Sequence, residues 1–373
     1  MKIFILDENS CNLNYQHNYI YQNLAKYFDI TDSINEADLI IIAETCCCTE
    51  YNILRTVGYI KSIIENKKDG AKIYLTGCIT RKFKDNPFLK KIEDWLKDNV
   101  DYIVPQNQPN LLLQLISKNK YFDRDINDFG TINIYSKDEA DIYIANGCLN
   151  NCSFCKITFQ KYPLKSVDLN EVKDAIDILN EEKISQIYLK ATNICQYGLD
   201  IYHEYMLPEI ISYLDKKENI KNVSLVGFSF KDAIQNNFEE VLRNSQKITK
   251  LCGSLESGSD RLLAMIRKGF TSDEIINFVA KIRQSYIKKL RLNIISGFPT
   301  ETLDDVYKTL EVLKQLSPDT VDICRYTNSS FVDSSQYEQL TTAEIQEHAR
   351  IYSKVLKKRN IEANVVCEGY KYN

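Results

Sequence analysis

The sequence predicts an α/β protein with two successive runs of alternating strands and helices. In the first run, over about the first 105 residues, buried-strand patterns alternate with segments of helical spacing, as in parallel α/β units. The second run adds six strand patterns separated by helical stretches. We therefore expect an N-terminal parallel, Rossmann-like α/β domain followed by a partial (β/α)6 barrel of the TIM type.

The first run contains four strand patterns and three helical ones. The strands are "KIFILD" (2–7), "ADLIIIAET" (37–45), "AKIYLTG" (71–77) and "VDYIVP" (100–105), and the helical segments are 13–28, 50–66 and 88–97. These elements place the first domain at residues 1–105. Residues 106–140 are polar and irregular after one short helix, which predicts a linker.

The second run fits an open, partial barrel better than a flat doubly wound sheet. Its strands are "DIYIANG" (141–147), "SQIYLKATN" (185–193), "NVSLVGFSF" (222–230), "ITKLCGSLES" (248–257), "KLRLNIISGF" (289–298) and "TVDICRYTN" (320–328). Helices are expected near 169–182, 204–216, 231–244, 259–285 and 302–315. Two of them begin with capping-box spacing, Asp168 with Glu171 and Thr271 with Glu274. The barrel is expected to cover 141–330, and 331–373 to form a helical tail with one helix at 341–359 and no β-barrel domain.

Composition narrows the class of protein. The chain has 373 residues, 12 of them cysteines, and a formal net charge of −4. This charge argues against binding to nucleic acid through a broad basic surface, although a local patch remains compatible with it. The N-terminus lacks the pattern of a signal peptide, and no stretch approaches the roughly 20 apolar residues of a membrane span. We expect a cytoplasmic protein without membrane contact, whose thiols stay reduced and serve metal or redox chemistry.

Three cysteines follow the first strand of the second run, in "NGCLNNCSFCKI". Cys148, Cys152 and Cys155 lie on a loop at the carboxyl end of that strand, where parallel α/β folds place their active sites. A structural zinc site requires four ligands, whereas three thiolates can hold three irons of a cubane cluster and leave the fourth iron open. The alternative is three buried, inert cysteines. The tight spacing and the preceding glycine favour the cluster.

A second set of cysteines follows three consecutive strands of the first run. Cys11 follows strand 2–7, Cys46, Cys47 and Cys48 follow strand 37–45, and Cys78 follows strand 71–77. The carboxyl ends of parallel strands meet at one edge of a sheet, which suits another three-thiolate cluster. Cysteines that only pack at strand ends are the alternative. The triple cysteine leaves the middle ligand open among three positions.

The C-x3-C-x2-C loop resembles that of the radical S-adenosylmethionine (SAM) enzymes, and the wider pattern resembles their methylthiotransferase family. The segments that carry this resemblance are "SCNLN", "ETC", "TGC", "IYLKATNICQYGLD", "SLESGSDRLLAMIRKGFT" and "IISGFPTETLDDV". It extends over about residues 1–330 and places the middle auxiliary ligand at Cys46. Two departures are Glu44, where the family has asparagine, and Glu256, where it usually has glutamine.

The resemblance implies a set of SAM contacts on the barrel rim. Phe154 is expected near the adenine, Glu256 at the hydroxyl or amino groups, and Arg267 at the carboxylate. Thr192 is expected to help hold the methionine end, and Gly297 to let the backbone approach the ligand closely. Each segment also has a simpler interpretation: a tight turn into a capped helix for Gly297, and a helix-surface cation for Arg267.

The implied cofactors are two [4Fe–4S] clusters and SAM, with a reductant such as flavodoxin or ferredoxin. In the family, the barrel cluster reduces SAM to a 5′-deoxyadenosyl radical that takes a hydrogen atom from an unactivated carbon. The N-terminal cluster carries the sulfur that is methylated and delivered to the substrate radical. Both clusters are expected to face one shared cavity.

Two departures bear on the acceptor. "CRYTNSSFVD" replaces the usual run after the sixth strand, and the chain ends at "EGYKYN", where family members continue into a small β-barrel that helps bind RNA or protein. We therefore expect a peptide, a protein or a small molecule as acceptor. The alternatives are a tRNA adenosine-37 methylthiotransferase and a non-catalytic, two-cluster electron-transfer protein.

The remaining cysteines and the histidines form no ligand pattern. Cys195, Cys252, Cys324 and Cys367 occur singly in apolar surroundings, which predicts buried, inert thiols. His17, His203 and His348 have no ligand spacing and are expected to face solvent.

Overall fold

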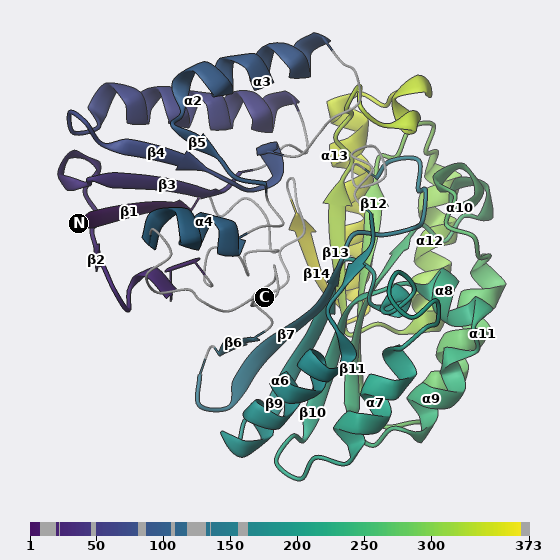
Figure 1. The fold of residues 1–373 in the computed structure, drawn as a ribbon. Coiled ribbons are helices and arrows are strands. Elements are labelled where there is room, and N and C mark those ends of the chain that lie inside the picture. The colour runs from purple at the N-terminus through teal and green to yellow at the C-terminus, as the bar shows by residue number, and fades with distance from the viewer. Residues whose placement is uncertain are drawn as a thin grey trace. The chain divides into compact units, whose positions relative to one another are not determined.

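The computed structural model describes residues 1–7, 20–21, 23–45, 50–80, 87–105, 109–117, 132–134, 136–155 and 163–366. These residues form two compact units: unit 1 extends to Asn133, and unit 2 runs from Ile134 to Val366. In both, a sheet of largely parallel strands carries helices (Figure 1). The α/β class and the two-part organisation of the fold are therefore confirmed.

The described part of unit 1 has a five-stranded parallel sheet in the order β2-β1-β3-β4-β5. The strands are β1 (Lys2–Asp7), β2 (Asp29–Ile30), β3 (Leu39–Glu44), β4 (Lys72–Leu75) and β5 (Tyr102–Ile103). The helices are α2 (Glu50–Asn66), α3 (Pro87–Asn99) and α4 (Pro109–Ser117). In Figure 1, α2 and α3 cover one face of this sheet and α4 the other.

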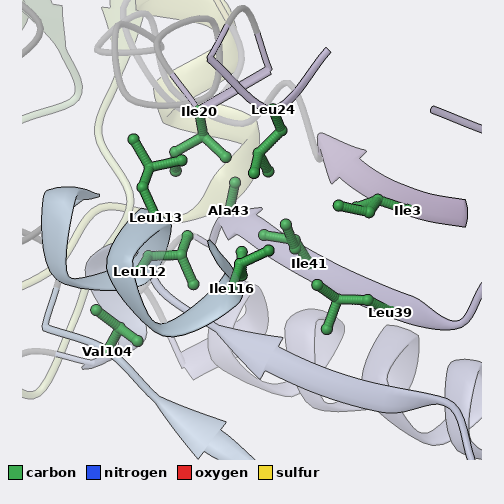
Figure 2. Packing of buried hydrophobic residues seen from close by; sticks show 10 residues of the cluster. All are labelled: Ile3, Ile20, Leu24, Leu39, Ile41, Ala43, Val104, Leu112, Leu113 and Ile116. Atoms are coloured by element: carbon green, nitrogen blue, oxygen red, sulfur yellow. The ribbon is translucent and has the colours of Figure 1, made fainter. Parts of the chain in front are cut away.

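The core on the α4 side combines alternate residues of β3 with side chains of α4 (Figure 2). Its members are Ile3, Ile20, Leu24, Leu39, Ile41, Ala43, Val104, Leu112, Leu113 and Ile116. The odd-numbered residues of β3 face this cluster because successive side chains of a strand alternate between the two faces. Ile40 and Ile42 are also buried, so β3 is covered on both sides, as in other parallel sheets. Since α4 belongs to this core, unit 1 continues into the range expected to be a linker.

Among the described residues, the sheet of unit 2 has nine strands in the order β14-β13-β12-β11-β10-β9-β7-β6, with β8 paired to β7, and its edge strand β6 begins two residues before the boundary at Ile134. Its strands are β6 (Ile132–Ile134), β7 (Glu139–Asn146), β8 (Lys165–Ser166), β9 (Gln186–Ala191), β10 (Asn222–Phe228), β11 (Ile248–Glu256), β12 (Lys289–Ser296), β13 (Thr320–Arg325) and β14 (Glu362–Val366). The six predicted barrel strands correspond to β7 and β9–β13. Their pairings are all parallel, so their carboxyl ends share one edge.

Eight helices of unit 2 lie within the described residues. They are α6 (Leu169–Glu181), α7 (Leu207–Asp215), α8 (Phe230–Gln235), α9 (Phe238–Asn244), α10 (Asp260–Ile266), α11 (Ser272–Ile282), α12 (Leu303–Leu316) and α13 (Thr342–Lys358). Two predicted helices are each split in two. Left-handed backbone at Asn237 separates α8 from α9, and left-handed backbone at Arg267 and Gly269 separates α10 from α11.

The capping and tail predictions are borne out only in part. Thr271 and Glu274 form the expected capping box, whereas Asp168 caps the backbone N–H of Asn170 without a reciprocal bond. The expected tail helix is present as α13. The same range also contains β14, which pairs in parallel with β13 and was not predicted.

Candidate metal centre

The cysteine loop of unit 2 begins with a backbone turn that only glycine fits well. Cys148, Cys152 and Cys155 follow β7 at the shared strand edge, as expected. Gly147 has φ +84°, and a Cβ there would lie 2.7 Å from the carbonyl carbon of Pro163 and closer still to its oxygen. Because both contacts are backbone atoms, no side chain could move aside. The glycine therefore sets the path of the chain into the first thiol.

Cys148 is a largely buried thiol with two N–H donors. The backbone N–H of Asn150 lies 3.4 Å from Cys148 Sγ, and Asn193 Nδ2 lies 3.5 Å from it. Burial raises the pKa of Cys148, and these two donors act in the opposite direction because they favour the thiolate. N–H donors to a cluster ligand are the outer contacts that orient it and tune the metal.

The middle of the loop is held by hydrogen bonds to both backbone groups of Ser153. Its N–H donates to the carbonyl of Ile266 at 3.0 Å, and its carbonyl accepts from the N–H of Ser334 at 2.9 Å. The loop is therefore held between the end of α10 and the segment after β13. This anchoring suits a site whose ligands must keep one arrangement.

The donor set fits a polynuclear cluster better than a single ion. Within the described residues, no group of three or more His, Cys, Asp and Glu side chains is arranged around one metal ion. In a cubane cluster each thiolate binds a different iron, so three cysteines on one loop need not converge on a single point. The soft thiolates and their N–H donors match that group.

Buried oxygens without partners lie on this loop and at the carboxyl ends of two barrel strands. Within the described residues, Ser153 Oγ, Asn193 Oδ1 and Glu256 Oε2 are buried and accept or donate no hydrogen bond. Buried polar atoms normally have partners, and such exceptions often mark a ligand site. Ser153 lies on the cysteine loop, Asn193 follows β9, and Glu256 ends β11, which is separated from β9 by β10. These atoms fit a polar cosubstrate such as SAM.

Glu256 is the most unusual of these groups. It ends β11 with left-handed backbone (φ +68°), which is costly for a residue with a Cβ, and it is 2% exposed. Its Oε1 lies 3.6 Å from Lys268 Nζ, which is itself mostly buried. Burial raises the pKa of Glu256, and Lys268 acts in the opposite direction. The strained backbone and the free oxygen are both consistent with a binding role.

The other residues expected to contact SAM lie at the same strand edge. Thr192 Oγ1 donates to Asn146 Oδ1 at 2.9 Å and accepts from the N–H of Gly147, so it supports the start of the cysteine loop. Phe154 packs against a small apolar cluster of Leu262, Ile266, Ile295 and Phe298. Arg267 forms an ion pair with Asp333.

Gly297 begins a turn that α13 covers. Its φ is +77°, and a Cβ there would collide with the side chain of Ile345. Its N–H donates to Glu301 Oε2 at 2.6 Å, and the same oxygen lies 2.7 Å from His348 Nδ1. Tyr352 donates to Glu301 Oε1 at 3.2 Å. The close approach at Gly297 is thus to a helix, and the expectation that His348 faces solvent is wrong, because it is buried on the inner face of α13.

In unit 1, the turn that carries Cys78 is held by Thr45. The carbonyl of Thr45 accepts from the N–H of Cys78 at 3.2 Å. Thr45 Oγ1 donates to the carbonyl of Thr76 at 3.1 Å and accepts from the N–H of Ile79 at 3.0 Å. A Cβ on Gly77 would lie 2.7 Å from the backbone nitrogen of Thr45. The end of β3 and the Cys78 turn therefore lie side by side.

Several predicted residues lie outside the described residues. They are Cys11, Cys46, Cys47, Cys48, Cys367 and His17. Cys195 and Cys252 are buried, as expected for inert thiols, and Cys324 is partly exposed. Sequence reasoning missed three residues: Asn193, which contacts Cys148, Lys268, which pairs with Glu256, and Asp232, which bonds to Asn193 and to Asn150 of the cysteine loop. Asn193 and Lys268 had a signal, since each directly follows a predicted ligand contact, Thr192 and Arg267.

Comparisons with known proteins agree with this architecture. The Radical SAM superfamily matches residues 142–313, and the Uncharacterized protein family UPF0004 matches residues 5–96. The first match includes the cysteine loop, most of β7 and β8–β12, and the second includes Thr45 and Cys78. The fold and the thiol loop together define a radical SAM protein of the α/β class.

The relatives identify the family. The ribosomal protein uS12 methylthiotransferase RimO of Thermosipho melanesiensis is 27% identical over 86% of this chain and 74% of its own length. The tRNA-2-methylthio-N(6)-dimethylallyladenosine synthase of Acetivibrio thermocellus is 24% identical over 88% of this chain and 70% of its own. The chain belongs to the radical SAM methylthiotransferase family, an enzyme family, as its sequence motifs predicted.

A solved structure supports the fold. The radical S-adenosylmethionine methyltransferase TsrM from Kitasatospora setae superposes with a TM-score of 0.59 at 13% identity, over 90% of this chain and 77% of that one. At this identity the likeness concerns the fold. None of the helices in the described part of the chain has the length and apolar character of a membrane span.

Proposed function

We propose that this methylthiotransferase attaches a methylthio group to an unactivated carbon of a peptide or protein, or of a small molecule, in the cytoplasm. It uses SAM and two [4Fe–4S] clusters, one in each unit. The observation that carries the proposal is that each unit presents cysteine at the carboxyl end of a parallel strand: the loop after β7 and the Cys78 turn after β4. One cluster would suffice for radical chemistry, and a second cluster would carry the sulfur that is transferred.

In unit 2, Cys148, Cys152 and Cys155 would hold the cluster that binds SAM at its open iron. When bound, the cluster and SAM supply the one-electron chemistry that removes a hydrogen atom from an unactivated carbon. The residues of the chain would hold the cluster and orient SAM. The free oxygen of Glu256 is available to a hydroxyl or amino group of SAM, and Phe154 offers an aromatic face at the rim.

In unit 1, Cys78 together with Cys11 and Cys46 would hold the auxiliary cluster that carries sulfur. Thr45 immediately precedes Cys46 and bonds to the turn of Cys78. The described neighbour of Cys46 thus lies beside the Cys78 turn, and the family resemblance favours Cys46 as the middle ligand over Cys47 or Cys48. The proposal also requires that both clusters serve one chamber, and a magnetic interaction between them in electron paramagnetic resonance spectra would test this.

For the acceptor, we favour a protein or peptide. The methylthiotransferase RimO relative acts on ribosomal protein uS12, and the net charge of −4 does not favour a polyanionic partner. A tRNA acceptor is the second candidate, because the Acetivibrio thermocellus relative is a tRNA-modifying synthase of similar identity. Flavodoxin or ferredoxin is the expected reductant.

The test is anaerobic turnover by the reconstituted full chain with SAM, sulfide and a reductant. Separate reactions contain uS12-derived peptides, peptides encoded beside the gene, and tRNA. Mass spectrometry measures 5′-deoxyadenosine and an acceptor that gains one S–CH2 increment. Two clusters predict about eight irons per chain. An increment on tRNA, together with tRNA affinity that falls steeply with salt, would replace the protein acceptor with RNA.

Cysteine variants separate the two sites. Cys148→Ala should abolish both products, whereas Cys78→Ala should abolish the S–CH2 increment and leave part of the SAM cleavage. Cys252→Ala is the matched control, because this buried thiol lies on β11 and belongs to neither set. It should retain both products. Fully reduced enzyme that never cleaves SAM would contradict the proposal and favour an electron-transfer protein.

A further inference from the structure

Asp232 is a buried carboxylate that gathers four neutral donors. It lies in the first turn of α8 and is 3% exposed. Its Oδ2 accepts from Asn193 Nδ2 at 2.9 Å, from Asn150 Nδ2 at 3.0 Å and from Ser229 Oγ at 2.6 Å. Its Oδ1 accepts from Gln196 Nε2 at 3.1 Å. Both oxygens are therefore satisfied, and the carboxylate is fixed in one orientation.

The donors of Asp232 connect it directly to the cysteine loop. Asn150 lies on that loop, between its first two cysteines. Asn193 Nδ2, which bonds to Asp232, also lies 3.5 Å from Cys148 Sγ. Gln196 reaches the loop as well, since its Oε1 accepts from the N–H of Leu149 at 2.8 Å. One carboxylate thus holds the loop and the end of β9 together.

The negative charge of Asp232 has no cationic partner among the described residues. Lys231, its neighbour, donates to Asn150 Oδ1 at 3.1 Å. Burying a carboxylate without a counter-charge is expensive, and a neutral side chain could accept some of the same hydrogen bonds at lower cost. Holding the loop therefore does not by itself explain why a carboxylate, rather than a neutral side chain, occupies position 232. The nearest candidate is the group that the cysteines bind.

We propose that Asp232 is a positioning residue that holds the Cys148 loop and, through its negative charge, lowers the reduction potential of the cluster bound there. The inference rests on the proposed function, since it requires a cluster on Cys148, Cys152 and Cys155. The physical basis is electrostatic: a fixed negative charge close to the cluster disfavours addition of an electron, most strongly in a poorly solvated site. A more reducing cluster is better suited to pass an electron to SAM.

The test uses the full chain with Cys11, Cys46 and Cys78 replaced by alanine, so that only the barrel cluster is reconstituted. In this parent, Asp232→Asn removes the charge and keeps the size of the side chain. The midpoint potential, from a redox titration followed by electron paramagnetic resonance without SAM, should shift to a more positive value. Asp215→Asn is the matched control: it removes a half-buried carboxylate at the end of α7, at the opposite edge of the strands, and should leave the potential unchanged.

A second variant separates the charge from the holding role. Asn150→Ala removes one link between the loop and Asp232 but keeps the carboxylate. It should release iron to a chelator about tenfold faster than the parent, because the loss of an outer contact of a metal ligand commonly weakens metal binding by at least that factor. The midpoint potential of Asn150→Ala should differ from that of the parent by less than the midpoint potential of Asp232→Asn does. Circular dichroism of the apo-proteins establishes that each variant is folded.

The outcomes distinguish this inference from the proposed function. A parent that takes up no iron would overturn both. A parent with a normal cluster, combined with an Asp232→Asn variant of unchanged potential and unchanged iron release, would overturn the inference and leave the function standing. A folded Asp232→Asn protein that cannot hold iron supports the holding role, and Asn150→Ala then decides whether the loop contact is the cause.

Discussion

The substitution Gly147→Ala tests the backbone turn that leads into the cysteine loop. Gly147 has φ +84°, and the added Cβ would meet the carbonyl carbon of Pro163 at 2.7 Å and the Cα of Leu164 at 3.0 Å. Left-handed backbone costs a residue with a Cβ about 1–2 kcal/mol. Overpacking against atoms that cannot rotate away adds about 1–3 kcal/mol. The free energy of unfolding of unit 2 should therefore fall by about 2–5 kcal/mol.

Thermal unfolding of the apo-protein, followed by circular dichroism under reducing conditions, measures this loss. For a domain of about 150–250 residues, each kcal/mol lowers Tm by roughly 2–4 °C, so a loss of about 3 kcal/mol predicts a decrease of about 6–12 °C. Iron content measures the second consequence. Because Gly147 directly precedes Cys148, the variant should lose the barrel cluster, which is about half of the iron of a two-cluster protein.

The matched control is Gly58→Ala in α2. A Cβ at Gly58 would meet no atom within 4 Å, and its backbone is helical. Alanine there should stabilise the helix by about 0.5–1 kcal/mol. The argument from close approach would be refuted if Gly147→Ala melted within about 1 °C of the wild type and retained all of its iron.

Much of the fold follows from short-range patterns in the sequence. Each predicted barrel strand is present, because a run of apolar residues bounded by polar turns has few alternatives. The strand ends in turn position the cysteines, since parallel pairing brings them to one edge. The loop glycine was also visible, as the residue before the first thiol. That only glycine fits there, because the backbone of Pro163 lies so close, could be seen only in the structure.

The helix boundaries show where local patterns fail. The sequence of 259–285 reads as one helix, but Arg267 and Gly269 adopt left-handed backbone and divide it. The break lets the end of α10 accept a bond from Ser153 of the cysteine loop. A tertiary contact therefore overrides the helical pattern at a functional position. The strand β14 was missed because its few apolar residues follow a helix closely and gain their pairing only from β13.

The polar contacts of the site lie further beyond the reach of sequence reasoning. Asp232 lies 82 positions from Asn150, and nothing local couples them. Its spacing from Ser229 indicates only a helix cap, a role that Ser229 does fulfil. His348 is a different case, since it shares the buried face of α13 with Ala349, Tyr352 and Leu356, at helical spacing. That periodicity was sufficient to predict its burial, although Glu301 as its partner was not predictable.

Substitutions at two further positions, Thr45 and His348, test the contacts of the Cys78 turn and of the Gly297 turn. Thr45→Val leaves the carbonyl of Thr76 and the N–H of Ile79 without their buried partner, which should lower the free energy of unfolding by about 1–3 kcal/mol. The auxiliary cluster should then lose iron to a chelator faster than in the wild type. Thr45→Ser keeps the hydroxyl and should behave like the wild type, and equal iron loss in both variants would contradict this role. For His348, the hydrogen bond to Glu301 raises the pKa above its ordinary value of 6.5, so the folded state binds the proton more tightly than the unfolded state. The resulting stability is fully present below about pH 6.5 and is lost as the pH rises through the higher pKa of the folded state. A hydrogen bond between charged groups contributes about 1.5–3 kcal/mol, so the difference in unfolding free energy between wild type and His348→Gln should shrink by about that amount across this range. Urea unfolding of the apo-proteins at several pH values measures it, and a difference that stays constant with pH would show that folding does not change the pKa of His348.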